Sequence, residues 1–453
     1  MSNEPSSGLA QRSVGLRGDW IASITNVAPT AATTLTMAAL IGASGLASPL
    51  ALLVAGAAML CCAVAYHRLN TWQASAAAPV EWVARGLSPI IGFAVGILVL
   101  MTALTSNIGN FTLIGSTVLS LIAPGETNNK PLTWVVATLI CLLVVAIAII
   151  GVKVTIRFEG WVILVEYMII AALAIWGLET ELTSHASGIT APSWSWFTTS
   201  HSPGGSTGLI AGVVIATFLL GGWDSPIYLG DEQQRQRDPG RSVLISITFC
   251  TLWVVFLFIC LQGLAPSSAI SNNASNVLPF LAGRLGPKVF VDLVALAVIA
   301  SFATTIQSQI VDGSRILFGM GRDNAIPKRF FGVVDPRTHI PRNNILLVGG
   351  LALAGAFLVS YQLGAELLNF GAFIGFMGVN LAAWMRYFVR NSQKTFLNLV
   401  LPLFGFMICL WIWLSLRTPA KLAGLTWLSA GLLYGAWKTR GFREKIAFAT
   451  AEE

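Results

Sequence analysis

The chain has 453 residues, of which 55% are hydrophobic and only 10% are charged, and its mean hydropathy is +0.74. Soluble domains carry about a quarter of charged residues, so this composition excludes a soluble protein and indicates one that crosses a membrane repeatedly. The net charge of +7 does not indicate nucleic-acid binding, because the basic residues gather in short segments between apolar stretches.

Apolar stretches of the length that a membrane-spanning helix needs, about 20 residues, recur along the whole chain. When the N-terminus is placed inside, all but five of the 27 Lys and Arg residues fall on the inner side, and this asymmetry predicts that both termini lie in the cytoplasm. The five exceptions are Lys130, Arg284, Lys288, Arg417 and Lys421. The twelve predicted spans are 20–42, 47–66, 89–122, 132–151, 159–178, 206–230, 242–264, 289–319, 344–361, 364–388, 396–416 and 421–438.

The first predicted helix contains a helix breaker near its middle. Pro29 lies in IASITNVAPTAATTLTMAAL, with polar Thr25, Asn26 and Thr30 around it. Proline removes a backbone donor and clashes one turn back. We therefore expect an interrupted helix whose free backbone groups face a cavity or protein and not lipid.

The third predicted helix carries polar residues on one face. Thr102, Ser106 and Asn110 recur at a spacing of four, and Asn107 lies beside Asn110. Amide groups inside a membrane need partners, and either a substrate or a neighbouring helix would supply them.

Glu166 is a carboxyl group inside the fifth predicted helix, in GWVILVEYMIIAALAIW. Such a residue is a functional hypothesis by default and is expected to face the interior of the bundle. Because burial disfavours the charged form of a carboxyl group, Glu166 is a candidate proton carrier. The alternative is a structural acid that is hydrogen-bonded to a neighbouring helix.

The sixth predicted helix is interrupted in the same manner as the first. In ATFLLGGWDSPIYLGDE, Gly221 and Gly222 weaken the helix and Pro226 breaks it. Interrupted helices five spans apart are the best sequence pointer to a transporter site built on an inverted repeat. Free N–H groups at such breaks attract carboxylates, and free carbonyl groups attract ammonium groups or cations.

Three further side chains of this segment are candidates for the same site. Asp224 adds a carboxylate that could hold a substrate amine or a proton, unless it is an acid at the helix end paired at the cytoplasmic face. Phe218 and Trp223 could close over a ligand, and ordinary packing is the alternative for both.

The eighth predicted helix has a hydroxyl-rich face. Ser301, Thr305, Ser308 and Asp312 share that face, and Thr304 lies beside it. Oxygen ligands of this kind suit a hard cation such as sodium, whereas Ser and Thr also hydrogen-bond back to their own helix.

No catalytic arrangement is visible in the sequence. The four histidines lie far apart, and no metal-protease, nucleophile-elbow or nucleotide-binding motif occurs. The six cysteines lie in apolar runs without metal-ligand spacing, which is typical of packing residues. We therefore predict a protein that is not an enzyme and that uses no cofactor or metal.

Several motifs resemble the amino acid–polyamine–organocation transporter superfamily. SRILFGMGRDNAIPKRF, followed by HIPRNN, is similar to the loop after the eighth helix of that family. Phe218, Leu220, Gly222, Trp223 and Asp224 resemble its sixth-helix pattern, and GDE, DPGRSV, EWVARGLSP and GVNLAAWMRY resemble flanking segments. The resemblance covers essentially residues 18 to 390.

The resemblance implies an all-α fold of the LeuT-like type and a domain organisation. It implies a ten-helix core of five-plus-five inverted repeats (20–390) and two additional helices (391–438). The charge asymmetry adds a cytoplasmic tail at each end, over residues 1–19 and 439–453.

The resemblance also implies site residues and alternating access between the two sides of the membrane. Backbone groups of Ala28, Pro29 and Thr30 and of Gly221, Gly222 and Trp223 would bind the carboxylate and amine of a substrate, and Phe218 would occlude it.

The chain departs from the family at two places. It has Ala-Pro-Thr where many members have a glycine-rich stretch, and it places Glu166 where many members have a lysine that stands in for sodium. Together with Asp224, Glu166 predicts an acidic cavity for a cationic or amine-rich substrate. Glu166 would carry a proton, or it would complete a cation site with Ser301, Thr304 or Thr305.

We therefore predict a secondary transporter of amino acids or related amines in the cytoplasmic membrane, coupled to protons or working by exchange. A dedicated permease for polyamines or small amines is the alternative. A sodium-coupled carrier and a channel are less favoured, and a membrane enzyme finds no support in the sequence.

Overall fold

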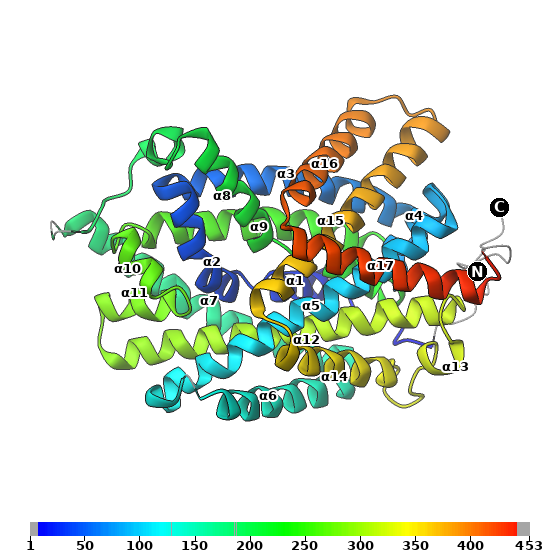
Figure 1. Ribbon diagram of the computed structural model, residues 1–453, viewed down its shortest axis with the longest axis horizontal. Helices are drawn as coiled ribbons and strands as arrows, with labels where there is room; N and C mark the ends of the chain where they lie inside the picture. The colour runs from blue at the N-terminus through cyan, green and yellow to red at the C-terminus, as the bar shows by residue number, and fades with distance from the viewer. Residues whose placement is uncertain (1–7, 128, 185, 187, 442–453) are drawn as a thin grey trace.

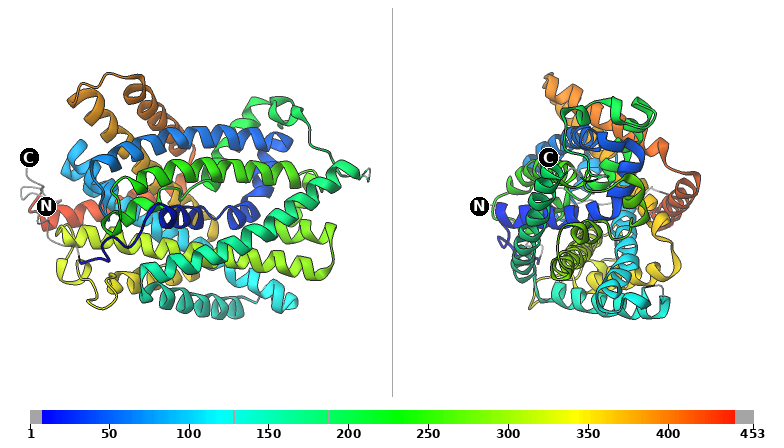
Figure 2. Two further views of the ribbon diagram at one scale, coloured as in Figure 1. Left: turned by 180° about the vertical axis from the view of Figure 1, so that it is seen from behind. Right: turned by 90° about the vertical axis from the view of Figure 1, so that its left-hand side faces the viewer.

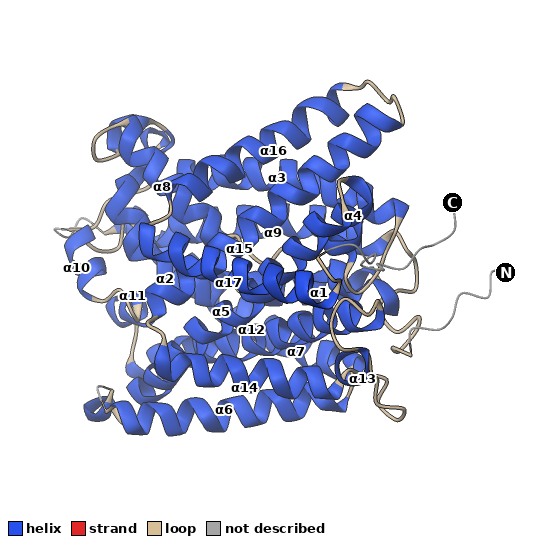
Figure 3. Cartoon of the chain, turned by 45° about the vertical axis from the view of Figure 1, so that its right-hand side comes forward, coloured by secondary structure: helices blue, strands red, loops and turns tan. Residues whose placement is uncertain are grey.

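The computed structural model describes residues 8–127, 129–184, 186 and 188–441. Apart from one isolated bridge, the regular elements of this part of the chain are helices (Figure 3), which confirms the all-α prediction. The segment that leads into α1 and the last turn of α17 lie at the same end of the bundle (Figures 1 and 2). We call this end the terminal face.

The bounds of the α-helices are as follows. They are α1 (Leu16–Val27), α2 (Pro29–Ser44), α3 (Ser48–Trp72), α4 (Ala78–Gly86), α5 (Pro89–Ile122), α6 (Lys130–Ile150), α7 (Val152–Thr183), α8 (Ser206–Leu219), α9 (Asp238–Leu261), α10 (Ser267–Asn272), α11 (Val277–Leu285), α12 (Lys288–Arg322), α13 (Lys328–Phe331), α14 (Arg342–Leu358), α15 (Tyr361–Ala383), α16 (Phe396–Ser415) and α17 (Thr418–Lys438).

Shorter turns connect or extend these helices. They are the 3-10 helices η1 (Gly45–Ala47), η2 (Pro124–Glu126), η3 (Trp194–Phe197), η4 (Thr199–His201) and η5 (Ser225–Glu232), and the π-helix η6 (Trp384–Arg390), which continues α15.

In the described part of the chain, eight helical runs are long and apolar enough to cross a membrane. The first run, Leu16–Trp72, contains α1, α2 and α3, and two shorter apolar helices, α8 and α14, accompany the eight. Each of the twelve predicted stretches overlaps a helix of the structure. The chain is therefore an all-helical protein with several apolar helices suited to a membrane, and the count of twelve spans stays a prediction.

The start of the predicted core (20–390) differs from the structure by a few residues, whereas its end coincides with the end of η6 at Arg390. The first helix begins at Leu16, after the N-cap Gly15 and within the predicted tail of residues 1–19, because a polar first turn that carries Asp19 is compatible with a helix start. Residues 1–7 of that tail and 442–453 of the predicted tail 439–453 lie outside the described residues.

The first predicted break lies between α1 and α2. Ala28 adopts a left-handed conformation with φ 45°, and Pro29 is the first residue of α2. A residue before proline is pushed out of the helical region, whereas proline itself suits the first position of a helix. A non-glycine residue in this conformation costs of order 1–3 kcal/mol and is typical of functional sites.

The second predicted break separates α8 from η5. The α-helix ends at Leu219, and Gly222 has φ 95°, a conformation that glycine adopts without a steric penalty. Pro226 then lies at the start of η5. The structure thus confirms both interruptions, and it places them at Ala28 and at residues 220–224.

A buried ion pair ties η5 to α12. Arg315 Nε donates to Glu232 Oε2 at 2.7 Å and Arg315 Nη2 donates to Glu232 Oε1 at 2.9 Å, with the two side chains 1% and 0% exposed. Arg315 is one of the basic residues that the charge asymmetry places on the inner side, and in the structure it is buried within α12.

Closer to the terminal face, a second arginine binds three carboxylates. The guanidinium group of Arg322 lies 2.8 Å from Glu81, 2.8 Å from Asp231 and 2.9 Å from Asp323. These contacts fasten α4 and η5 to the last turn of α12.

We predict that Glu232→Gln lowers the melting temperature of the protein in detergent, because it leaves the Arg315 cation buried without a counter-charge. Removing one partner of a buried pair costs about 3–5 kcal/mol. The double variant Arg315→Met/Glu232→Leu removes both charges and should recover most of the loss. As a matched control, Asp292→Asn breaks the exposed pair with Lys288 and should change stability by less than about 1 kcal/mol. Equal melting temperatures for Glu232→Gln and Asp292→Asn would contradict the conclusion that the buried Arg315–Glu232 pair stabilises the fold.

Candidate substrate-binding site

The two helix breaks lie against each other in the middle of the bundle. Ser23 Oγ on α1 donates to the carbonyl oxygen of Trp223 at 2.8 Å. A methyl group added at Gly222 would lie 2.6 Å from Asn26 Oδ1 and 2.9 Å from the Asn26 carbonyl oxygen. Only a residue without a side chain allows this approach.

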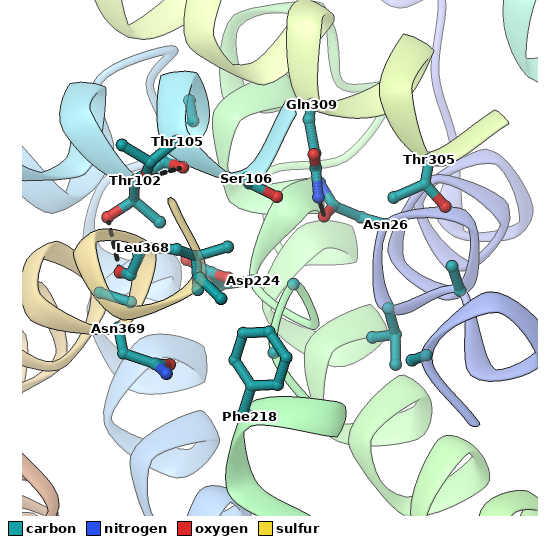
Figure 4. A pocket seen from close by; sticks show the side chains of 18 of the residues that line it. Asn26, Thr102, Thr105, Ser106, Phe218, Asp224, Thr305, Gln309, Leu368 and Asn369 are labelled. Atoms are coloured by element: carbon teal, nitrogen blue, oxygen red, sulfur yellow. Dashed lines mark hydrogen bonds between the residues drawn. The ribbon is translucent and has the colours of Figure 1, made fainter. Parts of the chain in front are cut away.

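A cavity lies beside the two breaks, between α5, α12 and α15 (Figure 4). Among the described residues that line it, none is Lys, Arg or His, and two are acids, Asp224 and Asp312. Polar and aromatic lining residues include Asn26, Tyr66, Thr102, Thr105, Ser106, Asn110, Phe218, Tyr228, Thr305, Gln309 and Asn369.

A chain of amide side chains connects α5, α12 and α1 across the cavity. Asn110 Nδ2 donates to Gln309 Oε1 at 3.1 Å, and Gln309 Nε2 donates to Asn26 Oδ1 at 3.4 Å. Asn26 Nδ2 then donates to Asp312 Oδ2 at 2.6 Å. The chain of donors ends on a carboxylate, so Asp312 is oriented from the cavity wall.

The two acids have hydrogen-bond donors but no ion-pair partner in the described part of the chain. Asp224 Oδ2 accepts a bond from Tyr228 Oη at 3.0 Å, and Asp312 accepts the bond from Asn26. Their exposed fractions are 9% and 5%. Ionisable side chains at membrane depth pair with other groups or mark substrate pathways, and here the free side of each carboxyl group faces the cavity.

The start of α2 offers few free donors to a carboxylate ligand. Pro29 has no N–H group, and the N–H group of Ala31 donates to Ser301 Oγ at 3.3 Å. The N–H group of Ala32 donates to the carbonyl group of Ala28 at 2.8 Å. Of the first four residues of this helix, whose N–H groups are the usual anion binders, only Thr30 keeps an uncommitted donor.

Glu166 lies outside the cavity, behind the first break. The residue is 3% exposed, and its carboxyl group lies beside the hydroxyl groups of Thr30 and Ser301. It therefore contacts α2 and α12 from α7. This placement agrees with the prediction that Glu166 faces the interior of the bundle.

The hydroxyl groups of α12 bond mainly to their own helix. Thr304 Oγ1 donates to the carbonyl groups of Ala300 and Ser301, at 3.0 and 3.1 Å. Thr305 Oγ1 also donates to the carbonyl group of Ser301, at 2.7 Å, and reaches the carbonyl group of Thr25 across the break at 3.1 Å. Thr305 alone of this group lines the cavity.

Several residues predicted for the site line the cavity and others do not. Those that line it are Asn26, Ala28, Asn110, Phe218, Gly221, Gly222, Asp224 and Thr305. Pro29, Thr30, Asn107 and Trp223 are absent from its lining, as are Glu166, Ser301 and Thr304.

Two of the residues outside the lining have other contacts. Trp223 is fully buried in an aromatic cluster, stacked on Phe376 with ring centres 5.2 Å apart and edge-on to Tyr66 at 5.1 Å. It therefore does not close over the cavity as expected. Asn107 turns back to the carbonyl group of Ala103 in its own helix at 3.2 Å.

Sequence reasoning missed Gln309 and Tyr228 and left Asp312 out of the site. The signal for Gln309 was present, since it follows Thr305 by four residues and precedes Asp312 by three, which places all three on one face of α12. Tyr228 had no such signal, because η5 has neither the α-helical nor the strand period.

A cavity beside two facing helix breaks in an apolar helical bundle is the arrangement of a membrane carrier. A family model described as Amino acid permease matches residues 20–429. The chain belongs to the amino acid permease family.

Relatives with curated names include carriers of different substrates. The low-affinity putrescine importer PlaP of Escherichia coli (strain K12) is 24% identical over 399 residues, which cover 86% of this chain and 85% of that protein. The methylthioribose transporter of Bacillus subtilis (strain 168) is 24% identical over 315 residues, 68% of this chain and 64% of the relative. The branched-chain amino acid permease BcaP of Lactococcus lactis is 26% identical over 255 residues, 53% and 54% of the two chains.

We predict that Gly222→Ala abolishes ligand binding, whereas the neighbouring Gly221→Ala weakens it far less. Gly222 has a positive φ and its added methyl group would overlap Asn26, but Gly221 has neither strain and its methyl group would meet only the Phe218 carbonyl oxygen at 3.2 Å. Ligand-induced shifts in melting temperature and uptake into proteoliposomes measure the effect. If both variants bind equally well, the close approach of the breaks is not needed for the site.

Proposed function

We propose that this protein is a secondary transporter that moves amino acids or related amines across the cytoplasmic membrane by alternating access. The facing breaks at Ala28 and Gly222, beside a polar cavity in an apolar bundle, carry this proposal. Membership of the amino acid permease family supports it. In this proposal the chain has twelve spans, a five-plus-five inverted repeat, two added helices and cytoplasmic termini, so the terminal face lies in the cytoplasm.

Within this range of substrates, the cavity suits an amine without a carboxylate. Asp224 and Asp312 offer two negative charges, and the described lining offers no cation to balance them or to bind an anion. A zwitterionic amino acid would bring a carboxylate to a helix start where proline and Ser301 have removed two donors. A carboxylate without partners in a buried site costs several kcal/mol.

The names of the relatives do not indicate one substrate, because they include a carrier of a diamine, a carrier of methylthioribose and a carrier of branched-chain amino acids. The diamine agrees best with the charge of this cavity. A diamine or polyamine could place one ammonium group at each acid, and a monoamine would leave one acid to bind a proton.

Coupling to protons is proposed through Glu166. Its carboxyl group contacts α2 on one side and α12 on the other, so a change in its charge alters the contact between these two helices. A sodium ion at the same place would need several oxygen ligands, whereas the described residues whose hydroxyl groups lie beside the Glu166 carboxyl group are Thr30 and Ser301, which offer two hydroxyl oxygens. Proton symport or substrate exchange is therefore favoured over sodium coupling.

Matched pairs of ligands test the substrate proposal, since each pair differs by one carboxylate. We predict that putrescine, cadaverine and agmatine bind at least ten times more tightly than ornithine, lysine and arginine. Binding to the purified protein is measured by thermal shift, where a ligand at a hundred times its Kd stabilises by about 2.7 kcal/mol. Asp224→Asn should abolish the shift with the diamines, whereas Asp292→Asn on the exposed part of α12 should leave it unchanged.

The possible outcomes distinguish the preference for amines from the more general proposal that the protein is a carrier. Equal or tighter binding of the amino acids would refute the amine preference but keep the transporter. Failure of all six ligands to bind or to exchange across proteoliposomes, together with ligand flux that does not saturate, would contradict the carrier itself and favour a channel.

For coupling, we predict that Glu166→Gln removes most of the pH dependence of uptake, because glutamine keeps the hydrogen bonds but cannot exchange a proton. Initial uptake rates into proteoliposomes are measured over a range of outside pH, with and without sodium. Glu179→Gln, at an exposed position of the same helix, is the matched control and should keep the wild-type profile. If Glu166→Gln keeps the pH dependence of the wild type, proton coupling involves another residue. If uptake requires sodium, the proposal of proton coupling is refuted.

A further inference from the structure

A second concentration of charge lies away from the cavity, at the terminal face. Four arginines from three elements converge where α3, α4 and η6 meet: Arg68 near the end of α3, Arg85 on α4, and Arg386 and Arg390 on η6. The last turns of α15 widen into the π-helix η6 at this place.

The guanidinium groups share aromatic rings. The Cζ atom of Arg386 lies 3.4 Å from the ring centre of Trp72, and that of Arg85 lies 5.8 Å from the same ring. Arg68 and Arg386 approach the ring of Tyr387, at 4.5 and 5.9 Å. Two cations on one ring lie within about 10 Å of each other, the distance over which salt screens charges, so these arginines repel one another.

The described part of the chain supplies no carboxylate to three of them. Arg68 Nη2 donates to the neutral Gln393 side chain at 3.3 Å, and Arg390 Nη1 donates to the carbonyl group of Arg85 at 2.8 Å. Arg386 Nε is buried without a hydrogen-bond partner among the described residues. Arg322, on the same face of the bundle, instead contacts three acids.

Apolar side chains are exposed next to these cations. Val389 of η6 is 45% exposed, and Phe396 and Leu397, at the start of the neighbouring helix α16, are 68% and 54% exposed. The start of α16 and the end of α15 lie at the periphery of the bundle (Figure 1). Cations at the end of apolar helices, beside exposed apolar residues, match a ligand with an anionic head and hydrocarbon chains.

We infer that this arginine cluster binds the phosphate group of an anionic phospholipid in the leaflet at the terminal face. Guanidinium groups bind phosphate oxygens in pairs and stack on aromatic rings, and both features meet here. A general excess of basic residues on one side of a membrane accounts for the sign of the charge. It does not account for the convergence of the arginines on shared rings, or for the buried Arg386 Nε–H group that has no partner among the described residues.

The position of the site gives it a consequence for transport. Arg68 belongs to α3, which also carries Tyr66 of the cavity lining, whereas Arg386 and Arg390 follow α15, which carries Asn369 of the lining. A phosphate bound between them neutralises the repulsion and joins two helices that flank the cavity. Anionic lipid is therefore expected to stabilise the protein and to change its transport rate.

Native mass spectrometry of the purified protein tests the site, using phosphatidylglycerol and phosphatidylcholine with identical acyl chains. We predict that phosphatidylglycerol is retained at least ten times more tightly and raises the melting temperature, and that millimolar inorganic phosphate does not displace it. Equal retention of the two lipids by the wild-type protein would overturn the inference. Displacement by inorganic phosphate would assign the site to free anions and would equally overturn it.

A pair of double variants locates the binding. Arg386→Gln/Arg390→Gln should reduce the retention of phosphatidylglycerol about tenfold or more. Lys328→Gln/Arg329→Gln on α13 removes the same charge from exposed residues of the terminal face and should leave retention unchanged. Equal losses in the two variants would show that net charge alone attracts the lipid. If the first variant fails to fold, the comparison of the two lipids on the wild-type protein still decides the outcome.

Discussion

A membrane offers no water to a free peptide group, so a helix can open inside one only where protein or a wet cavity receives its donors and acceptors. This chain opens two helices and places the openings in contact. The Ser23 hydroxyl binds the carbonyl group of Trp223, and Gly222 allows Asn26 to approach its backbone. Everything else in the site follows from this contact, because the cavity forms where the two interrupted helices leave room beside α12.

The charged side chains around the cavity fall into two groups, those with a partner of opposite charge and those without one in the described part of the chain. Toward the terminal face, Arg315 and Arg322 are matched with carboxylates, and Trp223 is packed among other rings. At the cavity, Asp224 and Asp312 have hydrogen bonds but no cationic partner among the residues that the structure describes. Charges that a fold leaves unpaired are held in place by the rest of the structure, and they are available to a ligand of opposite charge.

The same contrast appears among the cations. Arg322 has three acids, whereas Arg386 has two aromatic rings, two neighbouring cations and a buried Nε–H group for which the described part of the chain supplies no partner. The acidic cavity and the basic cluster lie on helices that touch both, α3 and α15. Ligands at either place would therefore act on contacts between the same helices, which gives the lipid environment a physical route to the transport site.

Sequence alone determined the helical membrane class, the approximate places of the helices and the two breaks, since apolar length, Pro29 and the glycines at 221 and 222 act locally. The family also followed from local motifs. Only the tertiary structure decided which polar residues meet. Asn107 is next to a cavity residue in the chain but turns away, because a step of one residue rotates a helical side chain by about 100°. Trp223 lies in the break between α8 and η5, where no helical period fixes its direction, and packing against Tyr66 and Phe376 turns it away from the cavity. Gln309 joined the site because Asn110 and Asn26, far away in sequence, approach it from other helices. Such meetings depend on how whole helices pack, and no local pattern records that.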